Sequence, residues 1–330
     1  MKAWVVPSKT QLGLQNLQLS DMPKPQPAAD QVLIAVRAVG LNPADYKLAQ
    51  VSDDSWGYPH ILGLDLAGEI TEVGSDVEDF GVGERVCAHI DLAGQGCFAE
   101  YATAPTYCVA HIPEKVSFEE AAGMMSTGIT AYQVIHRKVN LANRKTALIH
   151  AGSGGVGSMA VQLAKEAGLT VYTTVPGNAK DFVRELGADV AIDFETENFV
   201  EEINRLTDGK GVDFILDPLG QGHVDQNIDL LAFNGDIVCL TTLPSAEAVN
   251  KLFLRGLGLH LIFVGAVHQS GNLQQMKDLS IMAKSMLSLM DERKVKVPIA
   301  RTFGFSELAT ALATLEKNPP FGKFVVTVNE

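Results

Sequence analysis

Residues 147–157 read Ala-Leu-Ile-His-Ala-Gly-Ser-Gly-Gly-Val-Gly, and this stretch decides the fold. A short apolar run is followed by Gly152, Gly154 and Gly157 in the spacing G-x-G-x-x-G. Apolar residues then recur at helical period over 156–167. The pattern predicts a strand, a tight turn and a helix. The first glycine would make the turn, the second would let the backbone approach a pyrophosphate, and the third would pack helix on strand.

The predicted turn has the features of a dinucleotide-binding site. A helix that begins there presents free N–H groups and the positive end of its dipole to phosphates. A glycine-rich turn in a parallel sheet without a ligand is the alternative interpretation. On the first interpretation, the residues expected to bind the phosphates are Gly152, Ser153, Gly154, Gly155, Val156 and Gly157.

Size and composition restrict the class of protein. A chain of 330 residues with 46% hydrophobic residues predicts a globular protein of two domains. The formal charge of −13 argues against nucleic acid and anionic membranes as partners, because both need basic surfaces. The segment 1–7 lacks the apolar core of a signal peptide. Since no two of the four cysteines are closely spaced, we expect a reducing, cytoplasmic location.

Residues 122–266 alternate between strand and helix patterns. Helical patterns in this region end before Gly187 and Gly209, which is typical of helix C-termini. Six strands joined by helices predict an α/β fold with a Rossmann, doubly wound, six-stranded parallel sheet. The expected strands are Thr146–His150, Thr170–Val175, Val190–Asp193, Val212–Asp217, Asp236–Leu240 and His260–Val264.

The flanking regions have a different character. Residues 1–121 are rich in Gly and Pro and predict a β-rich domain, in which 31–39 alternates like a strand with one buried face. Residues 267–330 contain two helical patterns and end in a strand at 323–328. We expect this C-terminal segment to return to the first domain.

Taken together, these segments resemble the medium-chain dehydrogenase/reductase superfamily, and its zinc-free quinone-oxidoreductase-like branch is the best match. The resemblance runs along nearly the whole chain and depends on the order and spacing of several motifs. These motifs are Gly40–Lys47, Leu62–Gly68, Val73–Val77, Val82–Val86, Phe98–Tyr101, Ser126–Tyr132, Ala151–Gly157 and Gly322–Val326.

The resemblance implies a GroES-like catalytic domain, a Rossmann domain and a cleft between them. It also implies an oxidoreductase of alcohol dehydrogenase-like fold that uses NADPH to reduce quinones or α,β-unsaturated carbonyl compounds. Two alternatives remain open: an enoyl or acrylyl thioester reductase of the same fold, and an NADPH-binding sensor or interaction protein with little turnover.

The zinc ligands of the superfamily's alcohol dehydrogenases are missing. Zinc requires Cys, His or carboxylate ligands in a tetrahedral array. The three ligand positions correspond to Asn42, Leu64 and Gly123, so we expect no metal. His60 and His89 are the possible substitutes, and we interpret both as loop or surface residues.

The end of the second Rossmann strand indicates which nicotinamide cofactor is bound. NAD-binding domains place an acid there to hold the ribose 2′-hydroxyl, and residues 169–180 contain none. Lys180 could neutralise a 2′-phosphate, with Thr174 and Asn178 as hydrogen-bonding partners. Lys180 could equally be a solvated residue at the start of the next helix. We expect NADPH rather than NADH.

The segment 42–47 contains the candidate catalytic residues. Asn42, Pro43 and Asp45 fit a helix N-terminus, in which the acid reaches back to the first residue. The resemblance places the same residues in the active-site wall, and both interpretations stay open for Asn42 and Asp45. Tyr46 and Lys47 are the nearest donors to a substrate oxygen. The family's catalytic tyrosine often lies one position later, where this chain has Lys47.

The remaining candidates are cofactor contacts. Thr127 and Thr130 are expected at the start of a helix, where capping is the alternative to a nicotinamide contact. Lys323 could equally be a surface lysine. His150 is expected to be a packed histidine with its ring nitrogens hydrogen-bonded. The cofactor contacts expected from strand ends and from the resemblance are Asp217, Leu219, Thr241, Val264, Gly322 and Lys323.

The sixth predicted strand, His260–Val264, is apolar and lies at the edge of the sheet. Members of this superfamily usually dimerise through that strand. An unpaired apolar edge favours association, so we expect a homodimer that binds a small-molecule quinone or enone.

Overall fold

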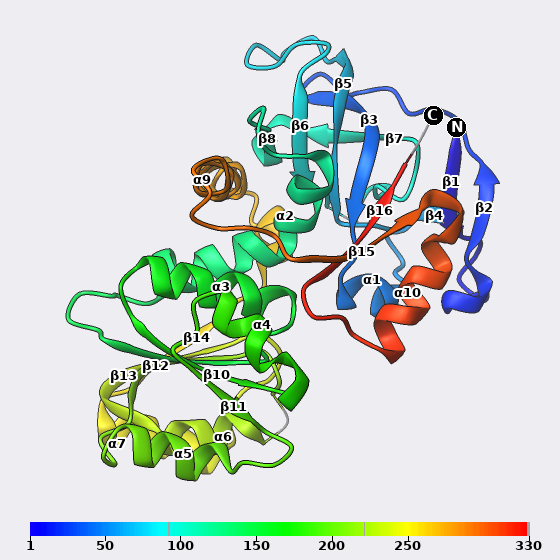
Figure 1. Ribbon diagram of the computed structural model, residues 1–330. Helices are drawn as coiled ribbons and strands as arrows, with labels where there is room; N and C mark the ends of the chain where they lie inside the picture. Colours follow the sequence, from blue (N-terminus) through cyan, green and yellow to red (C-terminus); the bar gives the residue numbers. More distant parts are fainter. Residues whose placement is uncertain (92, 221, 329–330) are drawn as a thin grey trace. The chain divides into compact units, whose positions relative to one another are not determined.

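The computed structural model describes residues 1–91, 93–220 and 222–328. The chain divides into two compact units (Figure 1). Unit 1 comprises Met1–Ile129 with Gly265–Glu330, and unit 2 comprises Thr130–Val264.

In the described part of unit 2, six parallel strands form one sheet in the order β11-β10-β9-β12-β13-β14. This is the doubly wound order of a Rossmann fold. The first four predicted strands are confirmed at both ends, whereas β13 begins earlier than predicted and β14 ends at Leu261 rather than Val264. The bounds are β9 Thr146–His150, β10 Thr170–Val175, β11 Val190–Asp193, β12 Val212–Asp217, β13 Leu231–Cys239 and β14 Gly258–Leu261.

Helices cover both faces of this sheet (Figure 1). α3 (Gly155–Glu166) and α4 (Lys180–Glu185) lie on one face. The opposite face carries α5 (Phe199–Leu206), α6 (His223–Asp229) and α7 (Ala246–Arg255), whose apolar residues pack on the inner strands. Since the inner strands β9 and β12 are buried on both sides, their sequences are largely apolar.

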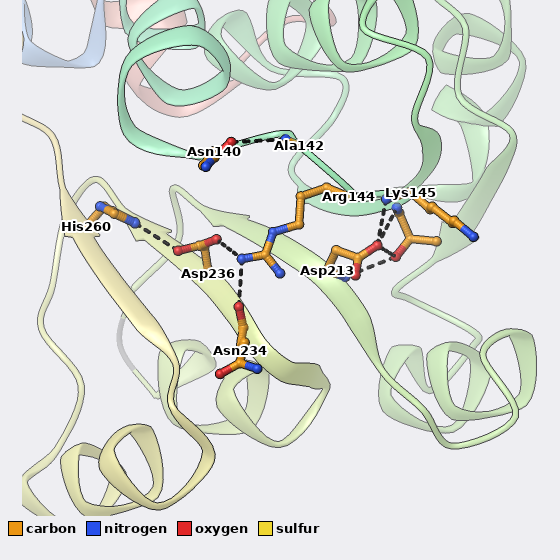
Figure 2. A network of polar contacts seen from close by, with 9 residues as sticks. Asn140, Ala142, Arg144, Lys145, Asp213, Asn234, Asp236 and His260 are labelled. Carbon is orange, nitrogen blue, oxygen red and sulfur yellow. Dashed lines mark hydrogen bonds and ion pairs between the residues drawn. The ribbon is translucent and has the colours of Figure 1, made fainter.

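A polar network ties together the amino ends of the strands, opposite the edge that carries the glycine turn (Figure 2). Arg144 donates to Asp236 Oδ2 at 2.7 Å and to the Asn234 carbonyl at 2.6 Å. Asp236 Oδ1 lies 3.0 Å from His260 Nε2, so the edge strand β14 is joined to the same network. Asp213 accepts from the Thr146 hydroxyl at 3.0 Å. These contacts fix the strand register on the side away from the candidate cofactor site.

Within the described residues, unit 1 holds a seven-stranded sheet and a three-stranded sheet. The central strand, β3 (Gln31–Gly40), was predicted to alternate between buried and exposed residues, but it is buried along almost its whole length, and β5, β7 and β16 pair along its edges. The other strands are β1 Lys2–Val6, β2 Gln18–Asp21, β4 His60–Ile61, β5 Asp65–Val73, β6 Arg85–His89, β7 Tyr101–Pro105, β8 Val109–His111, β15 Ile299–Gly304 and β16 Lys323–Thr327.

The C-terminal segment belongs to unit 1, where β16 pairs antiparallel with β3. α2 is introduced by Ser117, whose hydroxyl accepts from the Glu120 amide at 3.1 Å. The helices of this unit are α1 Pro43–Leu48, α2 Phe118–Gln133, α8 Leu273–Met276, α9 Asp278–Asp291 and α10 Leu308–Lys317; α2 continues into unit 2.

Candidate functional site

Two glycines of the turn after β9 are required by the chain's own packing. A Cβ on Gly152 would lie 2.0 Å from Thr173 Oγ1, and a Cβ on Gly157 would lie 2.1 Å from the Ala151 carbonyl oxygen. The predicted role of Gly157, packing α3 against the strand end, is confirmed. The left-handed residue of the turn is Ala151, with a φ of 51°, so Gly152 is needed for its close contact with β10 and not for its φ angle.

Gly154 differs from these two glycines. A Cβ added there would meet only the Ala151 carbonyl oxygen, at an ordinary 3.4 Å, and its φ of −80° suits any residue. α3 begins directly after it. Among the described residues, the N–H groups of Gly155, Val156 and Gly157 donate to no protein acceptor. Nothing in the protein itself requires glycine at position 154, but a bound group close to the backbone would. Free helix amides lie directly behind this position, and the two features together fit a bound pyrophosphate.

Four other predicted cofactor residues lie at the same carboxyl edge of the sheet. Asp217 ends β12 and is fully buried, and its Oδ1 accepts from the amides of Leu219 and Gly220 at 2.8 Å each. Leu219 and Thr241 are exposed, and Val264 is half-buried. Asp217 therefore shapes the loop that presents Leu219.

A buried chain of hydrogen bonds runs behind the turn. His150 Nδ1 lies 2.8 Å from Thr174 Oγ1, and His150 Nε2 lies 2.8 Å from Asn227 Oδ1. Asn227 in turn donates to Asp217 Oδ2 at 2.9 Å. Burial lowers the pKa of His150, so its ring is neutral. The prediction of a packed, hydrogen-bonded histidine is confirmed. Thr174, a predicted cofactor contact, is buried, and its hydroxyl is hydrogen-bonded to the His150 ring.

Lys180 and Asn178 lie in the segment after β10. Asn178 is exposed in the short 3₁₀ turn Gly177–Ala179, and Lys180 is half-buried at the start of α4. The Lys180 ammonium forms an ion pair of 2.6 Å with Glu197 Oε2. Neither of the two alternatives foreseen for Lys180, a phosphate ligand or a solvated residue, included this partner.

A second polar group, which we call the buried cluster, lies in unit 1 and consists of Asn42, Asp45, Asp65, Ser126 and Lys323. Asp65 Oδ2 accepts from Asn42 Nδ2 at 2.7 Å and from the Ser126 amide at 3.0 Å, and Asp65 Oδ1 accepts from the Ser126 hydroxyl at 2.7 Å. Lys323 Nζ donates to Asn42 Oδ1 and to the Leu41 carbonyl, both at 2.7 Å.

Asp45 completes the buried cluster from the first turn of α1. Its Oδ2 accepts from the Asn42 amide at 2.7 Å, which confirms the predicted acid reaching back at the helix start. Burial, followed by repulsion from Asp65, raises the pKa of Asp45 to about 8. Burial also lowers the pKa of Lys323. With Asp45 protonated, the Lys323 ammonium balances the single charge of Asp65.

The buried proton of Asp45 makes the stability of unit 1 depend on pH. In the unfolded chain this carboxyl ionises near 3.8, whereas in the folded chain it stays protonated up to about 8. Between these values the unfolded state binds fewer protons, so the free energy of unfolding falls as pH rises and levels off above about 8. Asp45→Asn should flatten this dependence in that window.

The measurement is denaturant unfolding followed by tryptophan fluorescence, because both tryptophans, Trp4 and Trp56, lie in unit 1. The exposed Asp76→Asn serves as the control and should retain the wild-type pH profile. An Asp45→Asn profile parallel to that of wild type would contradict the assignment of a proton to Asp45.

Tyr46 and Lys47 follow Asp45 on α1 but are not members of the buried cluster. Lys47 is exposed, and Tyr46 is half-buried. Partial burial, followed by the charge of Glu316 on α10, raises the pKa of Tyr46. The hydroxyl therefore keeps its proton at neutral pH. Their catalytic roles stay predictions.

The prediction that Thr127 and Thr130 begin a helix is wrong. α2 starts at Phe118, so both threonines lie well inside it, and capping does not explain them. The Thr127 hydroxyl donates back to the Gly123 carbonyl at 3.0 Å and is buried. The charged residues at 119–120 and the cap at Ser117 mark the true start.

Gly322 has a structural reason to be glycine. Its φ is 90°, and an added Cβ would lie 1.9 Å from the Pro298 carbonyl oxygen. The Lys323 amide donates to the same carbonyl at 2.8 Å. Lys323 is 3% exposed, which excludes the surface-lysine alternative. Gly322 therefore lets the chain turn so that Lys323 enters the buried cluster.

The interpretation of His60 and His89 as loop or surface residues is wrong. His60 lies on β4, buried and stacked on Trp56 with ring centroids 4.2 Å apart. His89 ends β6, buried, with its Nδ1 at 3.1 Å from His268 Nε2. Burial lowers the pKa of His60 to about 4. Both histidines are therefore neutral core residues.

The residues at the expected zinc positions do not fit that metal. The Asn42 side chain is hydrogen-bonded to Asp65 and Lys323, so an ammonium already lies 2.7 Å from its Oδ1. Leu64 and Gly123 offer no ligand atom in their side chains. No three His, Cys, Asp or Glu residues of the described ranges come together as a possible metal site. The donor set lacks the thiolates and imidazole that hold catalytic zinc.

Sequence reasoning missed several residues that contact the predicted ones. Asp65 accepts from Asn42 and is itself held by Ser126, and Glu197 pairs with Lys180. A signal for Asp65 was available: a lone carboxylate inside the apolar segment 61–67 is typical of a buried, hydrogen-bonded acid. Glu197 gave no comparable signal, because its partner lies 17 positions away in another loop.

Within the described residues, none of the helices has the length and apolar character needed to cross a membrane.

Comparison with known proteins identifies the family. Residues 28–114 match the model of the alcohol dehydrogenase GroES-like domain, and residues 155–284 match the model described as zinc-binding dehydrogenase. The chain is 30% identical over 330 residues to a chloroplastic quinone oxidoreductase of Triphysaria versicolor, which covers 95% of this chain and 94% of that protein.

Two solved structures are also similar. The quinone oxidoreductase of Coxiella burnetii is 31% identical with a TM-score of 0.81, covering 100% of this chain and 99% of that one. A mycobacterial protein solved in complex with NADPH is 26% identical with a TM-score of 0.86, covering 99% and 100%. These likenesses extend over both units, and the chain therefore belongs to the quinone oxidoreductase branch of the medium-chain dehydrogenase/reductase superfamily.

Proposed function

We propose that this protein is an NADPH-dependent reductase that acts on quinones or α,β-unsaturated carbonyl compounds without a metal ion. The observation that carries the proposal is Gly154, a glycine that the chain's own packing does not need, in front of helix amides without protein acceptors. A pyrophosphate at this turn explains both features. The names of the relatives support the reaction class.

The residues that would hold the cofactor lie mainly at the carboxyl edge of the unit 2 sheet. The free amides of 155–157 would hold the pyrophosphate, with Ser153 and Gly154 beside it, and the loops that carry Leu219, Thr241 and Val264 would line its path. When bound, the reduced nicotinamide supplies a hydride. Thr127, Thr130, Gly322 and Lys323 remain proposed contacts, although the Thr127 hydroxyl and the Lys323 ammonium already have protein partners.

Three features support NADPH over NADH. The end of β10 carries no acid to hold a ribose 2′-hydroxyl. Lys180 and Asn178 lie in the segment that follows. The mycobacterial relative was solved with NADPH. Because the Thr174 hydroxyl is already hydrogen-bonded to His150, Asn178 is the better candidate for hydrogen bonding to a 2′-phosphate.

The chemistry suits an acceptor that needs no Lewis acid. Hydride addition to a quinone or an enone spreads the negative charge onto the substrate oxygen, where hydrogen-bond donors suffice. We propose Tyr46 and Lys47 as these donors. Tyr46 keeps its proton at neutral pH and can deliver it to the reduced product. Asn42, whose side chain bonds to Asp65 and Lys323, and Asp45, whose Oδ2 accepts from the Asn42 amide, would shape the wall and not transfer protons.

An oxidant screen tests the proposal. Purified protein is assayed with NADPH and NADH against a naphthoquinone, a simple enone and an enoyl thioester, each with and without a chelator. We expect faster oxidation of NADPH by the quinone or the enone and no effect of the chelator. Turnover of the thioester alone would favour that alternative, and tight NADPH binding without oxidation would favour a sensor. Chelator-sensitive activity would contradict a metal-free reaction.

We also propose that the protein is a homodimer. β14 lies at the edge of the sheet and pairs only with β13 among the described strands. Leu261 on this strand is 51% exposed, and Phe263 just beyond it is 80% exposed. An open strand edge beside exposed apolar side chains favours pairing with a second copy.

We expect light scattering to give the mass of two chains for wild type, and the mass of one chain for the double variant Leu261→Glu and Phe263→Glu, because two charges would oppose burial of the edge. Val82→Glu, at a residue of unit 1 that is 66% exposed, is the matched control and should remain dimeric. A wild-type protein with the mass of a single chain would show that the dimer proposal is wrong.

A further inference from the structure

The ion pair of Lys180 joins the start of α4 to a loop at the carboxyl edge of the sheet. Lys180 follows β10, and Glu197 lies in the loop between β11 and α5. The Lys180 Nζ lies 2.6 Å from Glu197 Oε2, and both side chains are partly exposed, at 27% and 37%. The only cation that we assign to the 2′-phosphate is thus already bound to a carboxylate of the same chain.

Glu197 is held firmly in this position. The Oε2 atom that contacts Lys180 also accepts from the Asp193 amide at 2.7 Å. Glu197 accepts hydrogen bonds from Lys180, which has the larger effect, and from the Asp193 amide. Both lower the pKa of Glu197, so it is ionised at neutral pH. The carboxylate therefore stays in place as a charged group.

A second carboxylate lies beside the same loop. Asp193 ends β11, and a Cβ added to Gly177 would lie 2.6 Å from its Oδ2. Hydrogen bonds from the Glu195 amide and the Thr196 hydroxyl lower the pKa of Asp193, so it is also ionised. The negative charges of Asp193 and Glu197 thus lie next to the segment 176–180, which carries the positive charge of Lys180. An incoming 2′-phosphate meets less positive charge there than the sequence around Lys180 indicates.

We propose that Glu197 sets the preference between the two nicotinamide cofactors by competing with the 2′-phosphate of NADPH for Lys180. The inference rests on the proposed function, since it assumes that the cofactor binds at the glycine turn of unit 2. Glu197 does not touch the reacting atoms; it is a specificity-determining residue that weakens NADPH binding and leaves NADH binding unchanged.

Glu197→Gln separates the charge from the loop structure. The amide oxygen of Gln can still accept from the Asp193 amide and from Lys180, so the loop keeps its hydrogen bonds. Only the negative charge is lost, and a neutral acceptor holds an ammonium less strongly than a carboxylate does. Glu195→Gln is the matched control, because Glu195 is an exposed acid of the same loop.

The experiment is calorimetric titration of NADP⁺ and NAD⁺ into wild type, Glu197→Gln, Glu195→Gln and Lys180→Met. We expect Glu197→Gln to bind NADP⁺ about two- to fivefold more tightly, as suits a partly exposed ion pair. Its affinity for NAD⁺ and the NADP⁺ affinity of Glu195→Gln should stay at wild-type values. Lys180→Met should lose most of the preference for NADP⁺.

The double variant Lys180→Met with Glu197→Gln tests the mechanism. If Glu197 acts by competing for Lys180, the gain from Glu197→Gln disappears in the Lys180→Met background. The same gain in both backgrounds would show general repulsion and overturn the competition. Equal NADP⁺ affinities of Glu197→Gln and Glu195→Gln would overturn the inference while leaving the proposed function intact. A wild-type protein that binds neither nucleotide would overturn both.

Discussion

Gly154→Ala is expected to lower the affinity for the nicotinamide cofactor at least about 100-fold while leaving the fold intact, a loss that corresponds to about 2.7 kcal/mol. The added methyl group would meet only the Ala151 carbonyl oxygen of the chain, at 3.4 Å. It would, however, occupy the space through which the backbone approaches the pyrophosphate. Calorimetry with NADP⁺ measures the affinity, and thermal unfolding measures the stability.

Gly157→Ala is the matched control, because it makes the same chemical change three residues later. Its methyl group would lie 2.1 Å from the Ala151 carbonyl oxygen, so α3 would have to move away from the strand end. This variant should lose thermal stability, whereas Gly154→Ala should lose about 1 kcal/mol or less through the weaker helix cap. If Gly154→Ala binds the cofactor as wild type does, the pyrophosphate does not lie at this turn.

The sheet of unit 2 was predictable because parallel strands covered on both faces are short, continuous apolar runs. β9 and β12 begin and end where their largely apolar runs do, and the glycine spacing marks the start of α3. β13 was less predictable. Its first residues, from Leu231, continue the apolar period of the preceding helix, so the pattern assigns Leu231 to that helix.

Unit 1 was harder to predict, because its strand pairings link segments far apart in the chain. The alternation of β3 predicts a half-exposed strand, but in the folded unit it is buried along almost its whole length. The charged residues at 119–120 are typical of a helix start and agree with the start of α2, whereas the motif that carries Thr127 draws attention to the middle of this long helix. In both cases the local pattern was correct, and the tertiary environment decided its meaning.

The candidate sites show the same division. The residues of the phosphate-binding turn are contiguous in sequence, and their spacing alone indicates their chemistry. The buried cluster instead combines Asn42, Asp65, Ser126 and Lys323 from four separate segments. No spacing rule links them, so Lys323 could be assigned to a cofactor or to the surface, but not to Asn42.

Lys323→Met should destabilise unit 1 by about 3–5 kcal/mol, because it removes the only cation of the buried cluster and leaves the Asp65 charge without an opposite charge. For a domain of this size that loss lowers the unfolding temperature by roughly 10 °C. Thermal unfolding followed by the fluorescence of Trp4 and Trp56 measures it in unit 1. Lys317→Met, at an exposed position of α10, removes the same charge and should change little.

The double variant with Asp65→Asn tests whether charge is the cause. An Asn at this position can accept from the Asn42 side chain and the Ser126 amide through its oxygen, and it can donate to the Ser126 hydroxyl through its nitrogen. With no charge left to balance, the double variant should be more stable than Lys323→Met alone, even though it carries one more substitution. If the two losses simply add, Lys323 stabilises the fold through packing and its hydrogen bonds to Leu41 and Asn42, and the charge balance derived for Asp65 is wrong.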